Sequence, residues 1–344
     1  MLPSESNEYP SISIIILNYN GLVFIEKCLK SVFASDYPNF EVIFVDNGST
    51  DGSVELVEKL FRSDLRLKII RNDSNFGFAE GNNIGVKDAK GKYLAFLNND
   101  TEVDSLWLRE ISAAISSDNE IAAAQCKLMQ MDNRKKLDSA GNYIDYFAIA
   151  YVRGYDEVDQ GQYDYICEIF GATGAALVVK KEVFNKVRGF DSDFFLTFED
   201  TDLCWRIWLS GYKIVFIPKA VVYHKGGGTT GKTITGNSVV YFFCRNRITS
   251  LLKNYSLQNL FRCLPVNTTF LLFYSLIRIK DYGTRMTMAV MRAIAWNILH
   301  LNKIMYKRKI VQSMRKKSDD FLINKGLMEP WSIKKMIAKL RFIR

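Results

Sequence analysis

Histidine is the scarcest residue type that bears on function: only two occur in 344 residues, at positions 224 and 300. The six cysteines lie at positions 28, 126, 167, 204, 244 and 263, and no two are spaced as Cys-x-x-Cys. We therefore do not expect a zinc site built from cysteine and histidine. With only 6 prolines and 21 glycines, the chain is not collagen-like or of low complexity.

Two kinds of hydrophobic segment are also missing. The N-terminal stretch lacks the basic and apolar segments of a secretory signal. No stretch offers the roughly 18 uncharged apolar residues that a membrane-spanning helix needs. We therefore expect reduced thiols and a cytoplasmic setting. Aromatic residues make up 13% of the chain, which excludes disorder throughout.

The charge is distributed unevenly along the chain. The net charge is +9, but residues 245–344 hold 21 Lys/Arg against 4 Asp/Glu, or +17. The first 244 residues hold 25 Lys/Arg against 33 Asp/Glu, or −8. This asymmetry predicts an acidic domain at residues 1–250, followed by a basic tail at residues 251–344 that would bind an anionic surface, either membrane or nucleic acid.

The first hundred residues alternate between short β-branched runs and segments with helical spacing. We expect strands at 11–17, 41–45, 67–70 and 93–97, helices at 22–33 and 54–61, and a loop followed by a helix within 77–89. Further strands are expected at 121–124, 175–179 and 212–217, a helix at 197–210, and loops or an antiparallel excursion at 130–165. The pattern predicts an α/β fold with a mainly parallel sheet flanked by helices, whose ligands bind beyond the carboxyl ends of the strands.

The basic tail contains an amphipathic pattern. Between Met288 and Met305, apolar residues recur at helical spacing, with Arg292, His300 and Lys303 among them. Such a helix lies in a membrane interface, or it packs on the catalytic domain, and the sequence leaves both alternatives open. The Lys307–Lys317 run is expected to be solvated. Nucleic acid is a less favoured partner, because the basic residues alternate with Leu, Ile and Met rather than with exposed aromatics.

Polar residues follow the predicted strands. Asp46 ends the second strand before a Gly-Ser-Thr turn, where it either binds a nucleobase or caps the turn. The segment from Asn75 to Gly85 holds three glycines and three asparagines around a helix start, which would leave backbone amides free for an anion. It matches neither a dinucleotide-binding Gly-x-Gly-x-x-Gly nor a P-loop.

The remaining candidates are carboxylates and one histidine. Asp100, after two asparagines, offers the oxygen chemistry that Mg²⁺ or Mn²⁺ prefers. Glu199 and Asp200 open a helix, where they either complement the helix dipole or supply a general base. His224 is structural, or it is a metal ligand if Asp100 lies nearby.

Taken in order, these motifs resemble those of family 2 glycosyltransferases, inverting enzymes of the GT-A fold, and most closely the rhamnosyltransferase-type branch. The resemblance covers about residues 10–250. Its motifs are Leu17-Asn18-Tyr19-Asn20-Gly21, Asp46–Asp51, Asn75–Gly85, Leu97–Thr101, Gly171–Ala175, Glu199-Asp200 and His224.

The resemblance implies a role for each motif. Asp46 would bind the nucleobase, and Asn98-Asn99-Asp100 matches the Asp-x-Asp motif with Asn98 in place of the first acid. The implied catalytic residue is Asp200, with adjacent Glu199 as the alternative base. The implied metal ligands for Mg²⁺ or Mn²⁺ are Asp100 and His224. The implied nucleotide-sugar residues are Leu17, Asn18, Asn20, Asp46, Asn75, Gly77, Gly81, Asn82, Asn98, Asn99 and Gly174.

The expected activity is transfer of a sugar, rhamnose first, from a dTDP- or UDP-sugar to a hydroxyl of a growing glycan. The basic tail suggests that this glycan is lipid-linked and that the protein is peripheral on the inner face of the cell membrane. The alternatives are a sugar-phosphate nucleotidyltransferase and a non-catalytic membrane scaffold of the same fold. The first typically needs a Lys/Arg-rich loop after the first strand, which Leu17–Gly21 does not supply.

Overall fold

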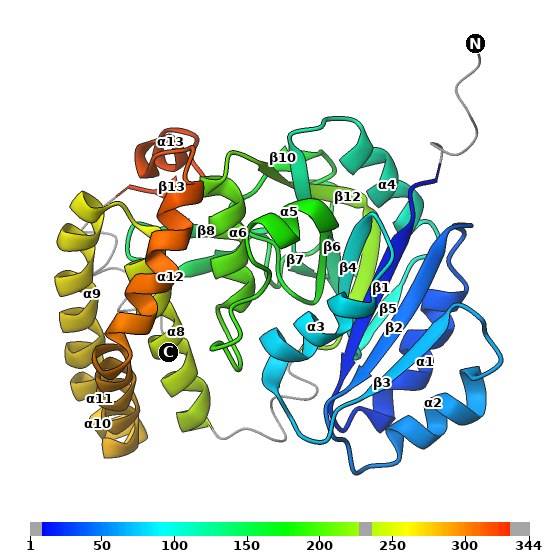
Figure 1. The fold of residues 1–344 in the computed structure, drawn as a ribbon, viewed down its shortest axis with the longest axis horizontal. Helices are drawn as coiled ribbons and strands as arrows, with labels where there is room; N and C mark the ends of the chain where they lie inside the picture. Colours follow the sequence, from blue (N-terminus) through cyan, green and yellow to red (C-terminus); the bar gives the residue numbers. More distant parts are fainter. Residues whose placement is uncertain (1–8, 227–235, 331–344) are drawn as a thin grey trace.

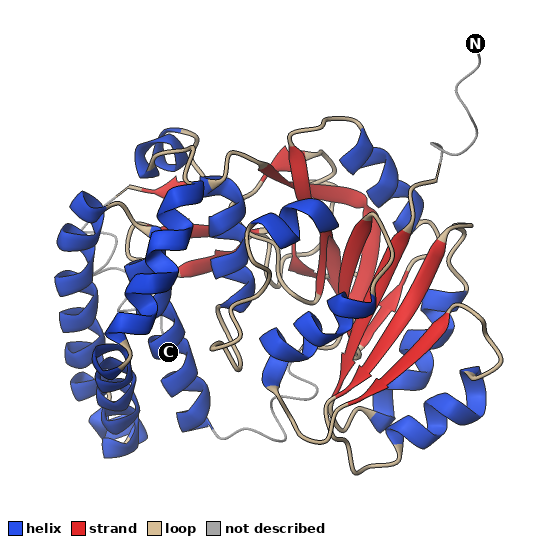
Figure 2. Cartoon of the chain, viewed as in Figure 1, coloured by secondary structure: helices blue, strands red, loops and turns tan. Residues whose placement is uncertain are grey.

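The fold is built around one mixed sheet. The computed structural model describes residues 9–226 and 236–330, and within them ten strands form this sheet (Figure 1). Side chains of successive β1 residues alternate between two separate cores: Ile12, Ile14 and Ile16 belong to one, and Ile15 to the other. Helices therefore cover both faces of the sheet, as expected of an α/β fold (Figure 2).

The first half of the sheet is parallel. Its strands are β1 (Ile12–Asn18), β2 (Phe40–Asp46), β3 (Leu67–Arg71) and β4 (Tyr93–Asn98), in the order β3-β2-β1-β4. The helices between and after them are α1 (Leu22–Phe33), α2 (Ser53–Phe61), α3 (Gly77–Asp88) and α4 (Trp107–Ser116). All the strands and helices expected in this region are present. The sequence analysis did not identify α4, which follows the short strand β5 (Thr101–Val103).

The second half of the sheet is mixed. Strand β11 (Ala176–Lys180) lies antiparallel between β4 and β6 (Ile121–Gln130), and β6 pairs in parallel with β12 (Lys213–His224). β12 continues past Pro218, where we expected it to end, because a register irregularity between Ile217 and Val221 accommodates the proline. The remaining elements here are β7 (Leu137–Ser139), β10 (Cys167–Glu168), α5 (Lys181–Lys186) and α6 (Glu199–Leu209).

Residues 130–165 form an antiparallel excursion rather than loops alone. β7 pairs with β6, while β8 (Asn142–Asp145) and β9 (Ala150–Val152) form a small sheet with β13 (Met328–Glu329). The predicted glycine-rich loop after His224 runs into residues 227–235, which lie outside the described residues.

The C-terminal part is helical. It comprises α8 (Gly236–Asn254), α9 (Leu257–Ile277), α10 (Ile279–Tyr282), α11 (Thr284–Leu299), α12 (Leu301–Met314) and α13 (Asp319–Asn324). α8 packs on α6 and on the inner sides of α9, α11 and α12, so α9 and α11 form the edge of the molecule opposite α2 (Figure 1). α8 runs through residue 250, and the division at that residue stays a prediction. Residues 331–344 of the predicted tail lie outside the described part.

Two expectations about the tail need correction. The helix expected from Met288 to Met305 is interrupted at His300, where α11 gives way to α12. The Lys307–Lys317 run is not simply solvated, because Lys307 pairs with two acids and Arg308 is buried, donating to the carbonyl of Leu252. The basic charge of α12 therefore balances acids of the catalytic half.

One helix of the described residues, α9, is long and apolar enough to cross a membrane by length and composition. The sequence analysis expected no such segment. The polar side of α9 is turned into the protein: Asn267 is fully buried and donates to the carbonyl of Phe147, at 2.8 Å. Asn259 accepts a hydrogen bond from Tyr146, at 2.9 Å.

Candidate active site

The carboxyl ends of three strands bring the first candidate residues together. In the parallel register, Asn18 lies opposite Asp46, and Leu17 lies opposite Asn98. The Asn18 side chain joins them: Nδ2 donates to Asp46 Oδ1 at 3.1 Å, and Oδ1 accepts from Asn99 Nδ2 at 2.8 Å. These residues, far apart in sequence, form one polar edge because parallel strands end on the same side.

The carboxylate of Asp46 is held by its own turn. Its Oδ2 accepts from the backbone amides of Gly48 and Ser49, at 3.1 and 2.9 Å, and its Oδ1 accepts from the Ser49 hydroxyl. Asn20 braces the same turn from the first loop, because its Oδ1 accepts from the Thr50 amide at 2.8 Å. Asp46 therefore caps its own turn in this structure.

The glycine-rich start of α3 has a packing role rather than free amides. The amide of Gly77 donates to Asn75 Oδ1 at 2.8 Å, and the next amide, that of Phe78, donates to the carbonyl of Phe195 at 2.7 Å. These two amides are therefore not free for an anion, contrary to expectation. A Cβ on Gly81 would lie 2.5 Å from the Leu17 side chain, so the glycine lets α3 approach β1.

Two buried asparagines lie close to Gly81. Asn82 is buried and donates to the carbonyl of Phe78 at 2.9 Å, within α3 itself. Asn47, which we did not single out, is buried and donates to Asn75 Oδ1 at 3.2 Å and to the carbonyl of Gly77 at 3.0 Å. Asn47 therefore ties the end of β2 to the start of α3.

Asp100 and His224 face each other, as the sequence analysis required for a metal role. The Nε2 atom of His224 lies 3.4 Å from Asp100 Oδ1, and its Nδ1 lies 2.8 Å from Asp138 Oδ2. Asp138 lies on β7, in the antiparallel excursion, and was not identified from the sequence. Burial opposes the charged ring, but the hydrogen bonds to Asp100 and Asp138 raise the pKa of His224 to about 9. A cation bound at Nε2 would displace the ring proton that these hydrogen bonds favour.

This arrangement fits a divalent cation shared with a bound phosphate. Asp138 fixes one ring nitrogen of His224 and turns the other towards Asp100, the usual outer-shell support of a ligating histidine. Within residues 9–226 and 236–330, no cluster of three or more acidic, histidine or cysteine side chains could hold a metal ion. Two protein donors would leave most coordination positions to phosphate oxygens and water, as is common for Mg²⁺.

Glu199 and Asp200 open α6, and their environments differ. The Asp200 side chain is partly exposed, and its Oδ2 accepts from the Gly174 amide at 3.0 Å. Its Oδ1 accepts from the Thr201 amide at 2.6 Å. Glu199 is buried, and its Oε2 has no hydrogen-bond partner among the described residues.

The pKa shifts of Glu199 and Asp200 also distinguish the two acids. Burial, reinforced by the charge of Asp200, raises the pKa of Glu199 well above its usual range. Burial also raises the pKa of Asp200, but the amides of Gly174 and Thr201 oppose that shift. Asp200 is therefore the carboxylate better suited to stay ionised and reach a ligand.

Gly174 links Asp200 to the polar edge. It precedes Ala175, whose carbonyl accepts a hydrogen bond from the Asn98 amide at 3.2 Å. The structure thus connects every predicted motif to the carboxyl edge of the sheet.

A mixed α/β sheet of this order, with acids at the carboxyl edge and after β11, defines a protein of the GT-A fold. Solved structures agree: GalNAc-T7 with UDP, GalNAc and Mn²⁺ superimposes with a TM-score of 0.58 at 17% identity, over 84% of this chain and 57% of that one. Staphylococcus aureus TarS 1–349 with UDP-GlcNAc gives 0.55 at 18% identity, over 88% and 91%.

The family model for glycosyl transferase family 2 matches residues 13–187, just over half of the sequence. The chain belongs to glycosyl transferase family 2. Glycosyltransferase GlyG of Streptococcus pneumoniae is 26% identical over 64% of this chain and 73% of its own length. The O-antigen biosynthesis protein RfbC of Myxococcus xanthus is 29% identical over 62% of this chain, but over only 17% of its own length.

A Sinorhizobium fredii protein, y4gI, is 30% identical over 64% of this chain. The chain spans 25% of y4gI and 35% of a Haemophilus influenzae glycosyltransferase that it also resembles.

Proposed function

We propose that this chain is an inverting glycosyltransferase that transfers a sugar from a nucleoside diphosphate to an acceptor hydroxyl. The observation that carries the proposal is Asp200, a partly exposed carboxylate fixed by the Gly174 amide beside the Asp46 and Asp100 edge. Asp200 would take the proton of the acceptor hydroxyl as its oxygen attacks the anomeric carbon. The bond to the diphosphate breaks on the opposite face, which inverts the configuration.

The donor would bind along the polar edge. Asp46, with Leu17 and Asn18, would meet the nucleobase after rearrangement of the turn that now occupies its carboxylate. Asp100 and His224 would hold Mg²⁺ or Mn²⁺, which would neutralise the leaving diphosphate. The neighbours solved with Mn²⁺ support a divalent ion of this kind.

We propose a dTDP- or UDP-sugar as donor, with rhamnose first, and a growing cell-surface glycan as acceptor. The O-antigen name of the M. xanthus relative supports the acceptor class. The TarS complex with UDP-GlcNAc makes N-acetylglucosamine a further donor to test.

The test is product identity. The purified chain is incubated with dTDP-rhamnose, UDP-glucose, UDP-galactofuranose and UDP-N-acetylglucosamine, with and without Mg²⁺ or Mn²⁺, and released nucleotide is quantified. Release of a nucleoside diphosphate supports the proposal. Release of pyrophosphate from a nucleotide and a sugar phosphate would identify a nucleotidyltransferase, and no turnover with any donor would favour the scaffold.

We further propose that α9 and α11 dock on an anionic membrane. Both helices turn large apolar side chains outward: Leu257, Phe261, Phe273, Leu276 and Ile277 on α9, and Met288, Met291, Ile298 and Leu299 on α11. Exposed Arg262, Lys280, Arg285 and Arg292 lie among them. Apolar side chains ringed by cations suit an interface with anionic headgroups, where each charge adds about 1 kcal/mol.

Vesicle co-sedimentation tests this docking. We expect the protein to bind vesicles that contain phosphatidylglycerol and to bind vesicles of phosphatidylcholine alone much more weakly. A double variant with Phe261→Ser and Met291→Ser should lose vesicle binding. Equal binding by that variant would contradict the proposed surface. Salt-sensitive binding to duplex DNA instead of vesicles would favour nucleic acid.

A further inference from the structure

The loop before the base has a strained backbone. Thr197 and Phe198 both adopt left-handed conformations, with φ of 66° and 70°. This region is unusual for any residue with a side chain and a genuine outlier for a β-branched one. The Thr197 hydroxyl is also buried without a hydrogen-bond partner among the described residues. Such a conformation persists only where the surroundings enforce it.

The enforcement comes from one face of α8. Asn246 is fully buried, and its Nδ2 donates to the carbonyls of Leu196 and Thr197, at 2.9 and 2.8 Å. Its Oδ1 accepts from Arg245 Nε at 2.9 Å, which fixes the orientation of the amide. The neighbouring Arg245 guanidinium also donates to the carbonyl of Asp193 in the same loop.

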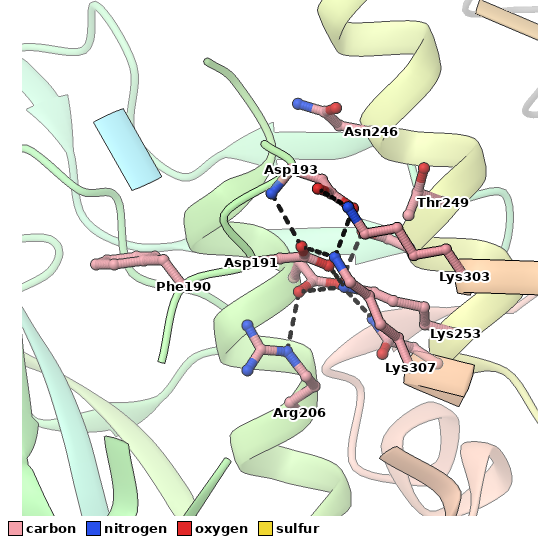
Figure 3. Close-up of polar contacts among 12 residues, drawn as sticks. Phe190, Asp191, Asp193, Arg206, Asn246, Thr249, Lys253, Lys303 and Lys307 are labelled. Carbon is pink, nitrogen blue, oxygen red and sulfur yellow. Dashed lines mark hydrogen bonds and ion pairs between the residues drawn. The ribbon is translucent and has the colours of Figure 1, made fainter. Parts of the chain in front are cut away.

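The same face of α8 holds the helix that follows the loop. Ser250 and Asn254 donate to Asp202 Oδ1, at 2.9 and 3.0 Å, and Lys253 lies 3.1 Å from its Oδ2. Lys253 also pairs with Asp191 at the start of the loop (Figure 3). Asn246, Ser250, Lys253 and Asn254 follow the i, i+4, i+7, i+8 spacing of one helix face.

These contacts lie on both sides of the base. Asn246 donates to carbonyls three and four residues before Asp200. Two residues after Asp200, the Asp202 carboxylate bonds Ser250, Lys253 and Asn254. On its other side, the carbonyl of Phe195 accepts from the Phe78 amide of α3, at 2.7 Å. The direction of the first turn of α6 is thus set by α8 and α3 together.

We propose that Asn246 is a positioning residue for Asp200. By holding the carbonyls of Leu196 and Thr197, it enforces the left-handed turn that aims Asp200 at the acceptor. The proposal rests on the proposed function, because it assigns Asn246 to the base of that reaction. Asn246 is buried and acts through the loop rather than on the substrate, so its substitution affects turnover and not donor binding.

The test is a double-mutant cycle between Asn246→Ala and Thr197→Gly. Glycine adopts positive φ without strain, so a glycine at position 197 no longer needs to be held. We expect N246A to lower kcat at least tenfold at an unchanged donor KM, T197G to stay within threefold of wild type, and the double variant to recover most of the loss. Thr249→Ala is the matched control, because Thr249 lies on α8 but bonds Asn297 of α11.

Each outcome bears on the proposal. A loss of kcat in T249A equal to that in N246A, or no recovery in N246A/T197G, would overturn it. If N246A alone does not fold, folding of the double variant counts as recovery, and failure of both counts against the proposal. The same cycle can be measured by melting temperature, which does not depend on activity. If the effects of N246A and T197G on the melting temperature are simply additive, Asn246 does not enforce the left-handed turn at Thr197.

Wild-type protein that turns over no donor yet shows this coupling in melting temperature would instead overturn the proposed function. In that case Asn246 would still stabilise the turn at Thr197, but the turn would not serve catalysis. The two failures are therefore distinguishable.

Discussion

Two acids on the first turn of α6 should respond to the same substitution in opposite ways. Asp200→Asn removes the proposed base while keeping the shape of the side chain. A general base contributes about 10²–10⁴-fold, so we expect kcat to fall by that factor. Burial raises the pKa of Asp200, so its charge is a cost to the fold, but the substitution also removes one of the two backbone hydrogen bonds that the carboxylate accepts. These effects oppose each other, so D200N should melt close to wild type.

Asp202→Asn should act on stability instead. Its fully buried carboxylate accepts from Arg206 Nε at 2.9 Å, in addition to its three contacts with α8. Breaking a buried ion pair by removing one partner costs about 3–5 kcal/mol. At about 2.1 cal/mol/K per residue, a chain of 344 residues unfolds with an entropy near 0.7 kcal/mol/K. The melting temperature of D202N should therefore fall by about 4–7 °C in a cooperative transition.

Both variants are measured by nucleoside diphosphate release and by thermal denaturation followed by circular dichroism. Below its melting point, D202N should keep more kcat than D200N does. A D200N protein with wild-type kcat would remove Asp200 as the base. A D202N protein that melts with wild type would show that the buried contacts of Asp202 contribute no net stability.

Three further predictions concern metal and pH. Asp100→Asn should weaken the response of turnover to Mg²⁺ or Mn²⁺, and an unchanged metal titration would remove Asp100 from the metal site. Because the raised pKa of Asp200 must be exceeded for it to act as base, kcat should rise with pH on a limb above the ordinary 3.8, and a limb at or below 3.8 would contradict this. Although burial opposes ionisation, Lys253 and Lys307 hold the pKa of Asp191 well below its usual 3.8. The stability that this ionised carboxylate contributes is present above pH 3.8 and is lost as the pH falls below it. We therefore expect the melting temperature to decrease once the pH is below about 4, and Asp191→Asn to reduce that decrease.

The parallel half of the sheet could be predicted from sequence because its information is local. Buried strands appear as β-branched runs, and each ends at a polar turn, so Asp46 and Asp100 could be placed at one edge. Asp138 could not be placed, because it lies in an excursion without regular periodicity and reaches His224 across 86 residues. The contact forms because β6 pairs with β7 on one side and with β12 on the other, and the β6–β12 pairing joins distant parts of the sequence.

The tail shows a second limit. α8 buries polar and charged residues on the side that faces α6, so its sequence lacks an apolar stripe, and the sequence analysis identified no helix there. The acids at positions 191, 193 and 202 pair with three of the C-terminal cations, which are Lys253, Lys303 and Lys307. A charge count by segment predicted the excess but not the partner.

The position of α8 also determines the order in which the chain can complete its fold. Asp202 leaves the ribosome 52 residues before Asn254, the last of its partners. Until α8 has emerged, Asp202 can pair only with Arg206 of its own helix, and the carbonyls of Leu196 and Thr197 lack the Asn246 amide that donates to them. The loop and helix that carry Asp200 can therefore reach their final packing only after α8 has been synthesised.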